Sequence, residues 1–74
     1  MAIVRKLEKI ILDKDHKHTE VDATYSIVEN EGQKYLQIDT YGSENRKIQG
    51  KKSQSIRFSF EAIEQLKAII DNEL

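Results

Sequence analysis

The chain contains no cysteine, no proline and no tryptophan, and only three glycines among its 74 residues. Without cysteine it can form neither disulfides nor cysteine metal sites, and we expect a reducing compartment, the cytoplasm. Without proline there is no stiff linker. No apolar run approaches the roughly 20 residues of a membrane-spanning helix, and the N-terminal region has no uncharged apolar block like that of a signal peptide. We therefore expect one small domain over residues 1–74, with no linker and no membrane partner.

The small size of the chain favours self-association. A domain of 74 residues buries a smaller fraction of its surface than a larger one, so a monomer has marginal stability. Small scaffolds usually need a disulfide, a metal or an oligomer to compensate. Because the disulfide is excluded, we predict a homodimer.

The charges are distributed unevenly, although the net charge is only −1. Residues 34–57 carry a net charge of +4, whereas residues 1–33 carry −2 and residues 58–74 carry −3. A localised basic region can attract a polyanion even when the whole molecule is close to neutral. The alternative is a solvated loop that is cationic only by local accident.

A C-terminal helix has the clearest pattern. From Phe60 onward, apolar residues recur at helical spacing, and charged side chains occupy the opposite side. Ser59 stands where a side chain can accept hydrogen bonds from the first free N–H groups of the helix. Ile63, Leu66 and Ile70 lie on the apolar stripe, and we predict that they form a dimer interface.

Three segments before the helix have strand patterns. "SQSIRFSF" alternates, with Ile56 and Phe58 on one side and Ser55 and Arg57 on the other. The segment 19–42 predicts a hairpin, because two alternating arms flank "NEGQ" at residues 30–33, and its glycine suits a short turn. Its second arm shows tyrosines, glutamine and aspartate on one face, and Leu36 with aliphatic neighbours on the other.

The first segment, residues 2–12, is compatible with a helix or a bent strand. We favour a strand, because it completes an open sheet beneath one helix. The sequence then predicts an α+β fold in the order β-β-β-β-α: a four-stranded curved antiparallel sheet followed by one C-terminal helix. One sheet face packs under the helix, and the other is polar with aromatic residues.

The polar face and the basic loop of residues 40–55 form the main candidate site. Proteins that bind single-stranded nucleic acid combine aromatic rings, on which bases stack, with cations that follow the phosphates. The predicted nucleic-acid-binding residues are Lys34, Tyr35, Tyr41, Ser43, Arg46, Lys47, Lys51, Lys52, Gln54 and Arg57. The alternative is that the two tyrosines form cross-strand pairs that stabilise an exposed sheet.

Other chemistry has little support. "GKKS" at residues 50–53 ends like a phosphate-binding loop, but Asn45 replaces the first glycine and a strand follows in place of a helix. His16 and His18 could share a metal, but no third histidine or cysteine completes a site, so we expect a solvated turn, no metal and no cofactor. No nucleophile and base are arranged for catalysis, and we expect a protein that is not an enzyme.

The order of elements also carries a family resemblance. "KYLQIDTYGS", a basic loop and "GKKSQSIRFSFEAIEQLKAII" together resemble the core of the positive-cofactor-four-like, or transcriptional coactivator-like, single-stranded DNA-binding proteins. The resemblance covers residues 34–70. It implies four antiparallel strands and a helix, dimerisation through that helix, and single strands bound on curved sheets. It also implies that Tyr41, Lys51 and Lys52 contact DNA.

The sequence therefore predicts a non-catalytic domain that binds single-stranded nucleic acid, DNA more than RNA, as a transcription or DNA-metabolism cofactor of a prokaryote or phage. A second hypothesis is a small adaptor or phage-type inhibitor that docks on a host protein through a sheet edge or the acidic helix face. The acidic flanks of the chain favour this alternative, because they repel nucleic acid.

Overall fold

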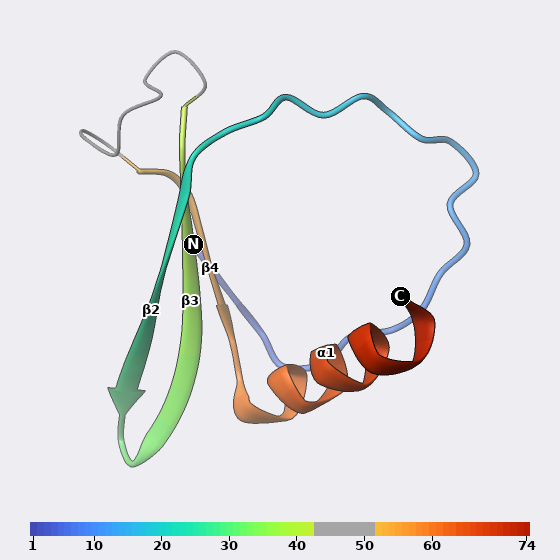
Figure 1. The fold of residues 1–74 in the computed structure, drawn as a ribbon. Helices are drawn as coiled ribbons and strands as arrows, with labels where there is room; N and C mark the ends of the chain where they lie inside the picture. The colour runs from blue at the N-terminus through green and yellow to red at the C-terminus, as the bar shows by residue number, and fades with distance from the viewer. Residues whose placement is uncertain (43–51) are drawn as a thin grey trace.

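The computed structural model describes residues 1–42 and 52–74 and has four strands followed by one helix (Figure 1). The elements are β1 (Ala2–Val4), β2 (Ala23–Asn30), β3 (Gln33–Tyr41), β4 (Lys52–Phe58) and α1 (Phe60–Glu73). This confirms the predicted α+β class and the order β-β-β-β-α. No helix within the described residues has both the length and the apolar character needed to cross a membrane.

The strands form one sheet in the order β1-β4-β3-β2. β2, β3 and β4 pair in antiparallel fashion, but β1 runs parallel to β4. The prediction of a purely antiparallel sheet is therefore wrong for this pair. β1 and β2 lie at opposite edges of the sheet and run in the same direction, so the chain between them crosses one face from one end of the sheet to the other, as a parallel connection requires.

The first segment forms a strand only over Ala2–Val4, much shorter than residues 2–12. Its partner limits its length, because β4 ends at Phe58, which pairs with Val4. The next backbone amide, that of Ser59, donates to the Val4 carbonyl at 3.0 Å and then begins the helix. Beyond this point the strand has no partner with which to continue.

The β2–β3 hairpin turns at Glu31 and Gly32, as the sequence predicts. Asn30 pairs with Gln33 across a two-residue loop. Both loop residues have positive φ angles, 51° at Glu31 and 77° at Gly32. Such angles match the twist of the strands in tight hairpins, and they are costly for residues other than glycine, asparagine and aspartate.

Ser59 caps α1 as predicted and also ties the helix to the N-terminal segment. Its side-chain Oγ accepts a hydrogen bond from the Ala62 amide at 3.2 Å and lies 3.4 Å from the Arg5 carbonyl, to which it donates. Ser59 and Ala62 are both buried. The strand end, the helix start and the first residues after β1 therefore meet at one point.

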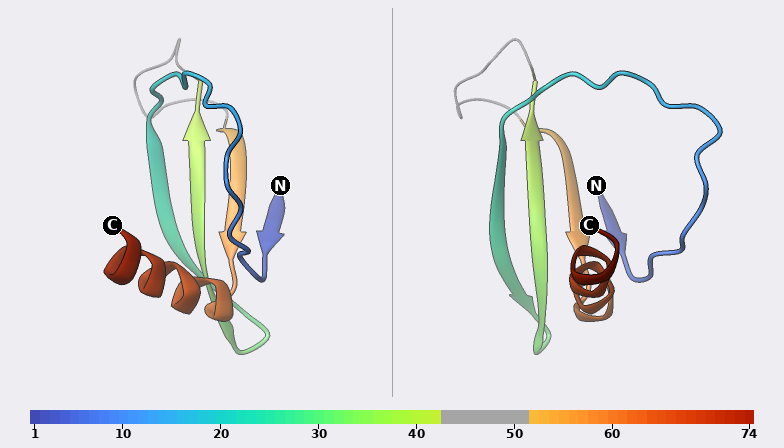
Figure 2. Two further views of the ribbon diagram at one scale, coloured as in Figure 1. Left: turned by 90° about the vertical axis from the view of Figure 1, so that its right-hand side faces the viewer. Right: turned by 45° about the vertical axis from the view of Figure 1, so that its right-hand side comes forward.

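The two faces of the sheet differ in character. The apolar face carries Tyr25 and Ile27 of β2, which pair with Ile38 and Leu36 of β3. The helix crosses this face near the end of the sheet that holds the hairpin turn, as the face-on view in Figure 2 shows. Neither the helix nor another described element lies over the opposite, polar face (Figure 2).

Residues 5–22 form a long segment without regular structure, which we call the arch. It leaves the sheet beside the helix, stands away from the apolar face and returns at the far end of the sheet (Figures 1 and 2). One end is held by Leu7, whose backbone N–H donates to Gln65 Oε1 at 2.8 Å and whose carbonyl accepts from Gln65 Nε2 at 3.2 Å. At the other end, the Asp22 carbonyl accepts from the Tyr41 amide at 3.0 Å.

Candidate nucleic-acid interface

A hydrogen-bonded network occupies the middle of the polar face. Gln37 pairs with Arg57 and Asp39 pairs with Ser55, so these four side chains share one face of β3 and β4. The Arg57 Nε donates to Gln37 Oε1 at 2.7 Å. The Gln37 amide nitrogen in turn lies 3.0 and 3.2 Å from the two carboxylate oxygens of Asp39 and donates to them. Asp39 therefore holds the Gln37 side chain in position, and Gln37 in turn holds Arg57.

Lys52 joins this network because of an irregularity in the strand pairing. Thr40 pairs with Gln54, but the next residue, Tyr41, pairs with Lys52, so β4 has one residue more than β3 at this point. Such a bulge shifts the alternation of side chains. The Lys52 Nζ consequently reaches Asp39 Oδ2 at 3.1 Å. A regular strand would direct Lys52 to the apolar face, with Gln54 and Ile56.

Asp39 is the electrostatic centre of the network. Its side chain is 5% exposed. A hydrogen bond from Ser55, and further ones from Gln37 and Lys52, hold the pKa of Asp39 below its usual value of 3.8, although burial acts in the opposite direction. The carboxylate is therefore ionised at neutral pH and neutralises part of the charge of Lys52.

Tyr35 and Tyr41 lie on this face but are buried, with only 9% and 8% of each residue exposed. The Tyr41 hydroxyl lies 3.2 Å from Thr24 Oγ1 on the neighbouring strand, and the Tyr35 hydroxyl donates to Gln33 Oε1 at 3.1 Å. The Tyr41 hydroxyl thus has a partner on the neighbouring strand, as the alternative interpretation of cross-strand pairing requires, whereas the Tyr35 hydroxyl has its partner on its own strand. A single copy offers only small ring edges for stacking.

Beside Arg57 the polar face is hollowed. A pocket of about 310 Å³ is lined by Met1, Ala2, Ile3, Gln37, Ser55 and Arg57. Ile3 pairs with Arg57 across the parallel strands, so an apolar side chain borders the guanidinium. Within residues 1–42 and 52–74, Arg57 forms no ion pair, and its only side-chain hydrogen bond runs through Nε. The two terminal nitrogens of the guanidinium are therefore available to a ligand on this side.

The structure does not bring all predicted site residues together. Lys34 pairs with Glu29 and lies on the apolar face with Leu36. Gln54 pairs with Thr40 and also lies on the apolar face, beside Ile56. Tyr35, Tyr41, Lys52 and Arg57 share the polar face. The remaining predicted residues, Ser43, Arg46, Lys47 and Lys51, lie outside the described residues.

Three members of the network, Gln37, Asp39 and Ser55, were not among the predicted site residues. The signal for them was present, because they alternate with aliphatic residues on β3 and β4 just as Arg57 does. The same alternation assigns Lys34 and Gln54 to the apolar face. Strand alternation therefore predicts the members of the polar face better than residue type does.

The two histidines lie in the arch and are exposed. His18 Nδ1 lies 2.7 Å from the His16 carbonyl oxygen, so this ring nitrogen has a backbone contact. Among the described residues, no group of three or more His, Cys, Asp or Glu side chains is close enough to bind a metal ion.

Comparisons with protein-family models, with curated proteins and with solved structures find no match to this chain. The resemblance to positive-cofactor-four-like proteins stays a prediction.

Proposed function

We propose that the chain is a non-catalytic domain that binds single-stranded nucleic acid along the polar face of β3 and β4. The observation that carries the proposal is Arg57, which Gln37 holds beside a hollow, and whose two terminal nitrogens have no partner in the described part of the chain. A planar guanidinium with two free N–H groups matches the geometry of a phosphate oxygen pair. Because Gln37 fixes the side chain in advance, little conformational entropy is lost when a phosphate binds.

The distribution of charge supports a bound strand that continues toward the β3–β4 connection. Lys52 lies on the polar face at the end of β4, and the residues that join Tyr41 to Lys52 include Arg46, Lys47 and Lys51. Phosphate contacts supply most of the affinity in sequence-independent binding. Since the rings of Tyr35 and Tyr41 are almost covered, phosphate contacts contribute more than stacking in this proposal.

We further propose that the domain acts as a homodimer of a transcription or DNA-metabolism cofactor, with DNA as the preferred strand. Ile70 is exposed, and Ile63 and Leu66 are half-buried, so the helix retains apolar area for a second copy. Two copies related by a two-fold axis double the number of phosphate contacts, and this raises affinity through effective concentration.

The test is a fluorescence-polarisation titration with labelled single-stranded DNA and with RNA of the same length and sequence. Arg57→Ala is expected to weaken binding roughly ten-fold or more, equivalent to the removal of one charge-assisted hydrogen bond. Lys34→Ala is the matched control, because it removes the same charge from the other face of β3. Equal reductions in both variants would indicate diffuse attraction and would contradict a site on the polar face.

The adaptor hypothesis is supported by the free edge of the sheet. Among the described residues, β2 pairs only with β3, so one side of an eight-residue strand can accept another chain. Retention on a single-stranded DNA column at low salt separates the two hypotheses. A protein that passes unretained would favour the adaptor.

A further inference from the structure

The isolated chain exposes far more surface than a folded monomer of its mass. Its accessible surface is 6780 Å², whereas the scaling of surface with mass gives roughly 4700 Å² for a monomer of 8.6 kDa. Its radius of gyration is 14.3 Å, against about 11 Å for a compact domain of this length. The excess, about 2000 Å² for each copy, is close to what one subunit buries in an obligate homodimer.

Part of the exposed surface is apolar and lies on the helix side of the sheet. Tyr25 and Ile27, on the apolar face of β2, are 75% and 64% exposed. Ile10, Ile11 and Leu12, in the arch, are 74%, 87% and 69% exposed. The arch stands on the same side of the sheet as the helix (Figures 1 and 2), so both sets of side chains border the same open region.

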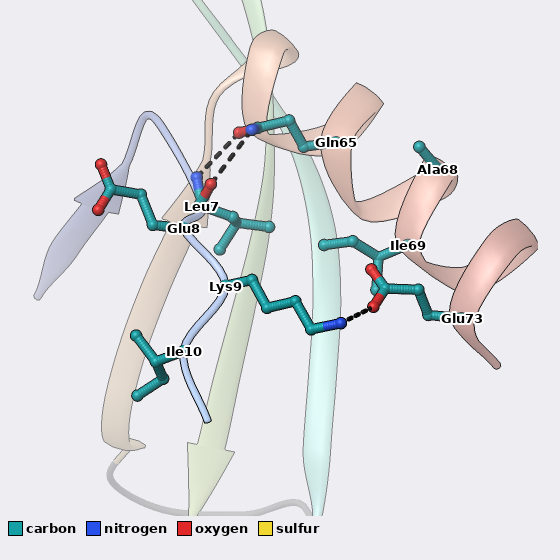
Figure 3. Close-up of a pocket in the computed structure, with 8 residues that line it drawn as sticks. All are labelled: Leu7, Glu8, Lys9, Ile10, Gln65, Ala68, Ile69 and Glu73. Atoms are coloured by element: carbon teal, nitrogen blue, oxygen red, sulfur yellow. Dashed lines mark hydrogen bonds and ion pairs between the residues drawn. The ribbon is translucent and has the colours of Figure 1, made fainter. Parts of the chain in front are cut away.

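The arch is held in place even though its apolar residues contact little of their own chain. Gln65 binds both backbone groups of Leu7, and Lys9 Nζ lies 2.7 Å from Glu73 Oε1 (Figure 3). Between Leu7 and Ile10 on one side and Ile69 on the other, a pocket of about 470 Å³ remains open (Figure 3). The arch is therefore tied to the helix at Leu7 and Lys9, immediately before Ile10, Ile11 and Leu12.

The chain's own helix and sheet cover none of these three aliphatic residues, because Ile10, Ile11 and Leu12 are 69–87% exposed. A contiguous exposed apolar cluster of this kind is typical of an interaction surface. Burial of the cluster therefore requires a second body.

We propose that the second body is another copy of this chain, and that each arch closes over the apolar sheet face of its partner. Residues Ile10–Leu12 of one copy then pack against Tyr25 and Ile27 of the other, and the contact is repeated by symmetry. An isologous interface requires that one chain carry both complementary surfaces. Here the apolar arch and the apolar face are both present on each copy, and both are exposed in a single copy.

The charges of the arch agree with self-association. Residues 13–20, "DKDHKHTE", contain three acidic residues, two lysines and two histidines, so charge of one sign does not dominate this part of the arch. This inference rests on the homodimer part of the proposed function. It does not depend on nucleic acid, because the contacts lie on the face of the sheet opposite to Arg57.

Cysteine cross-linking tests the geometry directly, because the natural sequence contains no cysteine. Ile11→Cys and Tyr25→Cys are made as separate chains, mixed, unfolded and refolded together, and oxidised mildly. A disulfide-linked heterodimer is expected. The control is Ile11→Cys mixed with Ser26→Cys, which places the thiol on the polar face and should give at least ten-fold less product. Equal cross-linking in both mixtures would overturn the proposal.

The double variant Ile11→Cys/Tyr25→Cys distinguishes the partner's sheet from the chain's own. An intermolecular product is expected at low protein concentration. A disulfide within one chain would show that the arch folds onto its own sheet, and this result would overturn the proposal.

Light scattering completes the test. The natural chain is expected to have twice the 8.6 kDa mass of one copy. Replacing Ile10, Ile11 and Leu12 together by serine should raise the dissociation constant at least 100-fold, without loss of the helical signal, because these side chains pack little on their own chain. Lys14→Ala/Lys17→Ala, in the same arch, should leave the dimer intact.

If the triple variant dimerises as well as the natural chain, the arch contact is wrong, although the chain is still a homodimer. A monomeric natural chain would overturn both.

Discussion

The Nζ atom of Lys52 lies 3.1 Å from Oδ2 of Asp39, and this ion pair exists because β4 has an extra residue opposite Thr40 and Tyr41. Without the bulge, the Lys52 side chain would lie on the apolar face of the sheet. With the bulge, it lies on the polar face. Asp39 is nearly buried, whereas Lys52 is about half exposed. A phosphate that approaches Lys52 must therefore compete with a carboxylate that cannot move away.

This competition leads to a prediction for the salt dependence of binding. Lys51→Ala/Lys52→Ala should weaken the binding of single-stranded DNA and make the plot of log affinity against log salt concentration less steep. The slope should fall by about 0.7 for each phosphate that the variant no longer binds, so by at most about 1.4. The measurement is polarisation at several salt concentrations, with circular dichroism to show that the variant folds. An unchanged affinity and slope would remove these lysines from the interface.

The lowered pKa of Asp39 predicts an acid dependence of stability. A carboxyl group that releases its proton more readily in the folded state stabilises the fold above its unfolded pKa, and this contribution is lost as the pH falls through the folded pKa. The natural chain should therefore lose stability as the pH decreases below the usual value of 3.8. Asp39→Asn should be less stable at neutral pH and should show a shallower loss in acid.

Urea unfolding from neutral pH to about pH 2, at one fixed protein concentration, measures this difference. Glu61, whose pKa is also lowered by its own backbone N–H and by Ser59, is present in both proteins, so its effect cancels in the comparison. Parallel pH profiles for the two proteins would show that Asp39 contributes nothing to the acid dependence.

The contact between Gln65 and Leu7 predicts a local effect of a single helix residue. Gln65→Ala removes the partners of two backbone groups and should cost about 1–3 kcal/mol of stability. The Leu7 amide should then exchange its hydrogen faster in a hydrogen–deuterium experiment. Gln65→Glu keeps an acceptor for the Leu7 N–H and removes the donor to its carbonyl, so it should preserve much of the protection of this amide.

The hairpin turn predicts a stabilising substitution. Glu31 has a φ angle of 51°, in the left-handed region that disfavours its side chain. Glu31→Asn should raise the stability by about 0.5 kcal/mol, because asparagine tolerates this region better. Gly32→Ala, at a φ angle of 77°, should have the opposite effect. Thermal unfolding of both variants provides the comparison, and a destabilised Glu31→Asn would show that the glutamate side chain has a compensating role.

Local patterns were sufficient to predict most of the fold. The helix after Ser59 and the hairpin around Gly32 each depend on short-range signals: a cap, a turn residue and a period. The parallel pairing of β1 could not be predicted in the same way. The spacing of Ile3, Leu7 and Ile11 suits either a helix or a strand, and β1 pairs with residues Ile56 to Phe58, which are distant in the sequence.

The site was predicted less completely than the fold. Arg57 and the two tyrosines were assigned to one face by alternation, and they lie there. The position of Lys52 depends on the bulge, which no residue type indicated. Alternation places Gln37 on the same face. Its residue type does not indicate a binding role, because Gln37 acts only through the arginine that it holds.

The pairing of β1 with β4 also determines the order in which the sheet can be built during synthesis. The hairpin of β2 and β3 is local and can form as soon as both strands have left the ribosome. The strand β1 is translated before them, yet it has no neighbour in the sheet until β4 has emerged as well. Ala2, Ile3 and Val4 therefore have no strand partner until β4 arrives. β1 is therefore the first strand to be synthesised but, together with β4, the last to be paired.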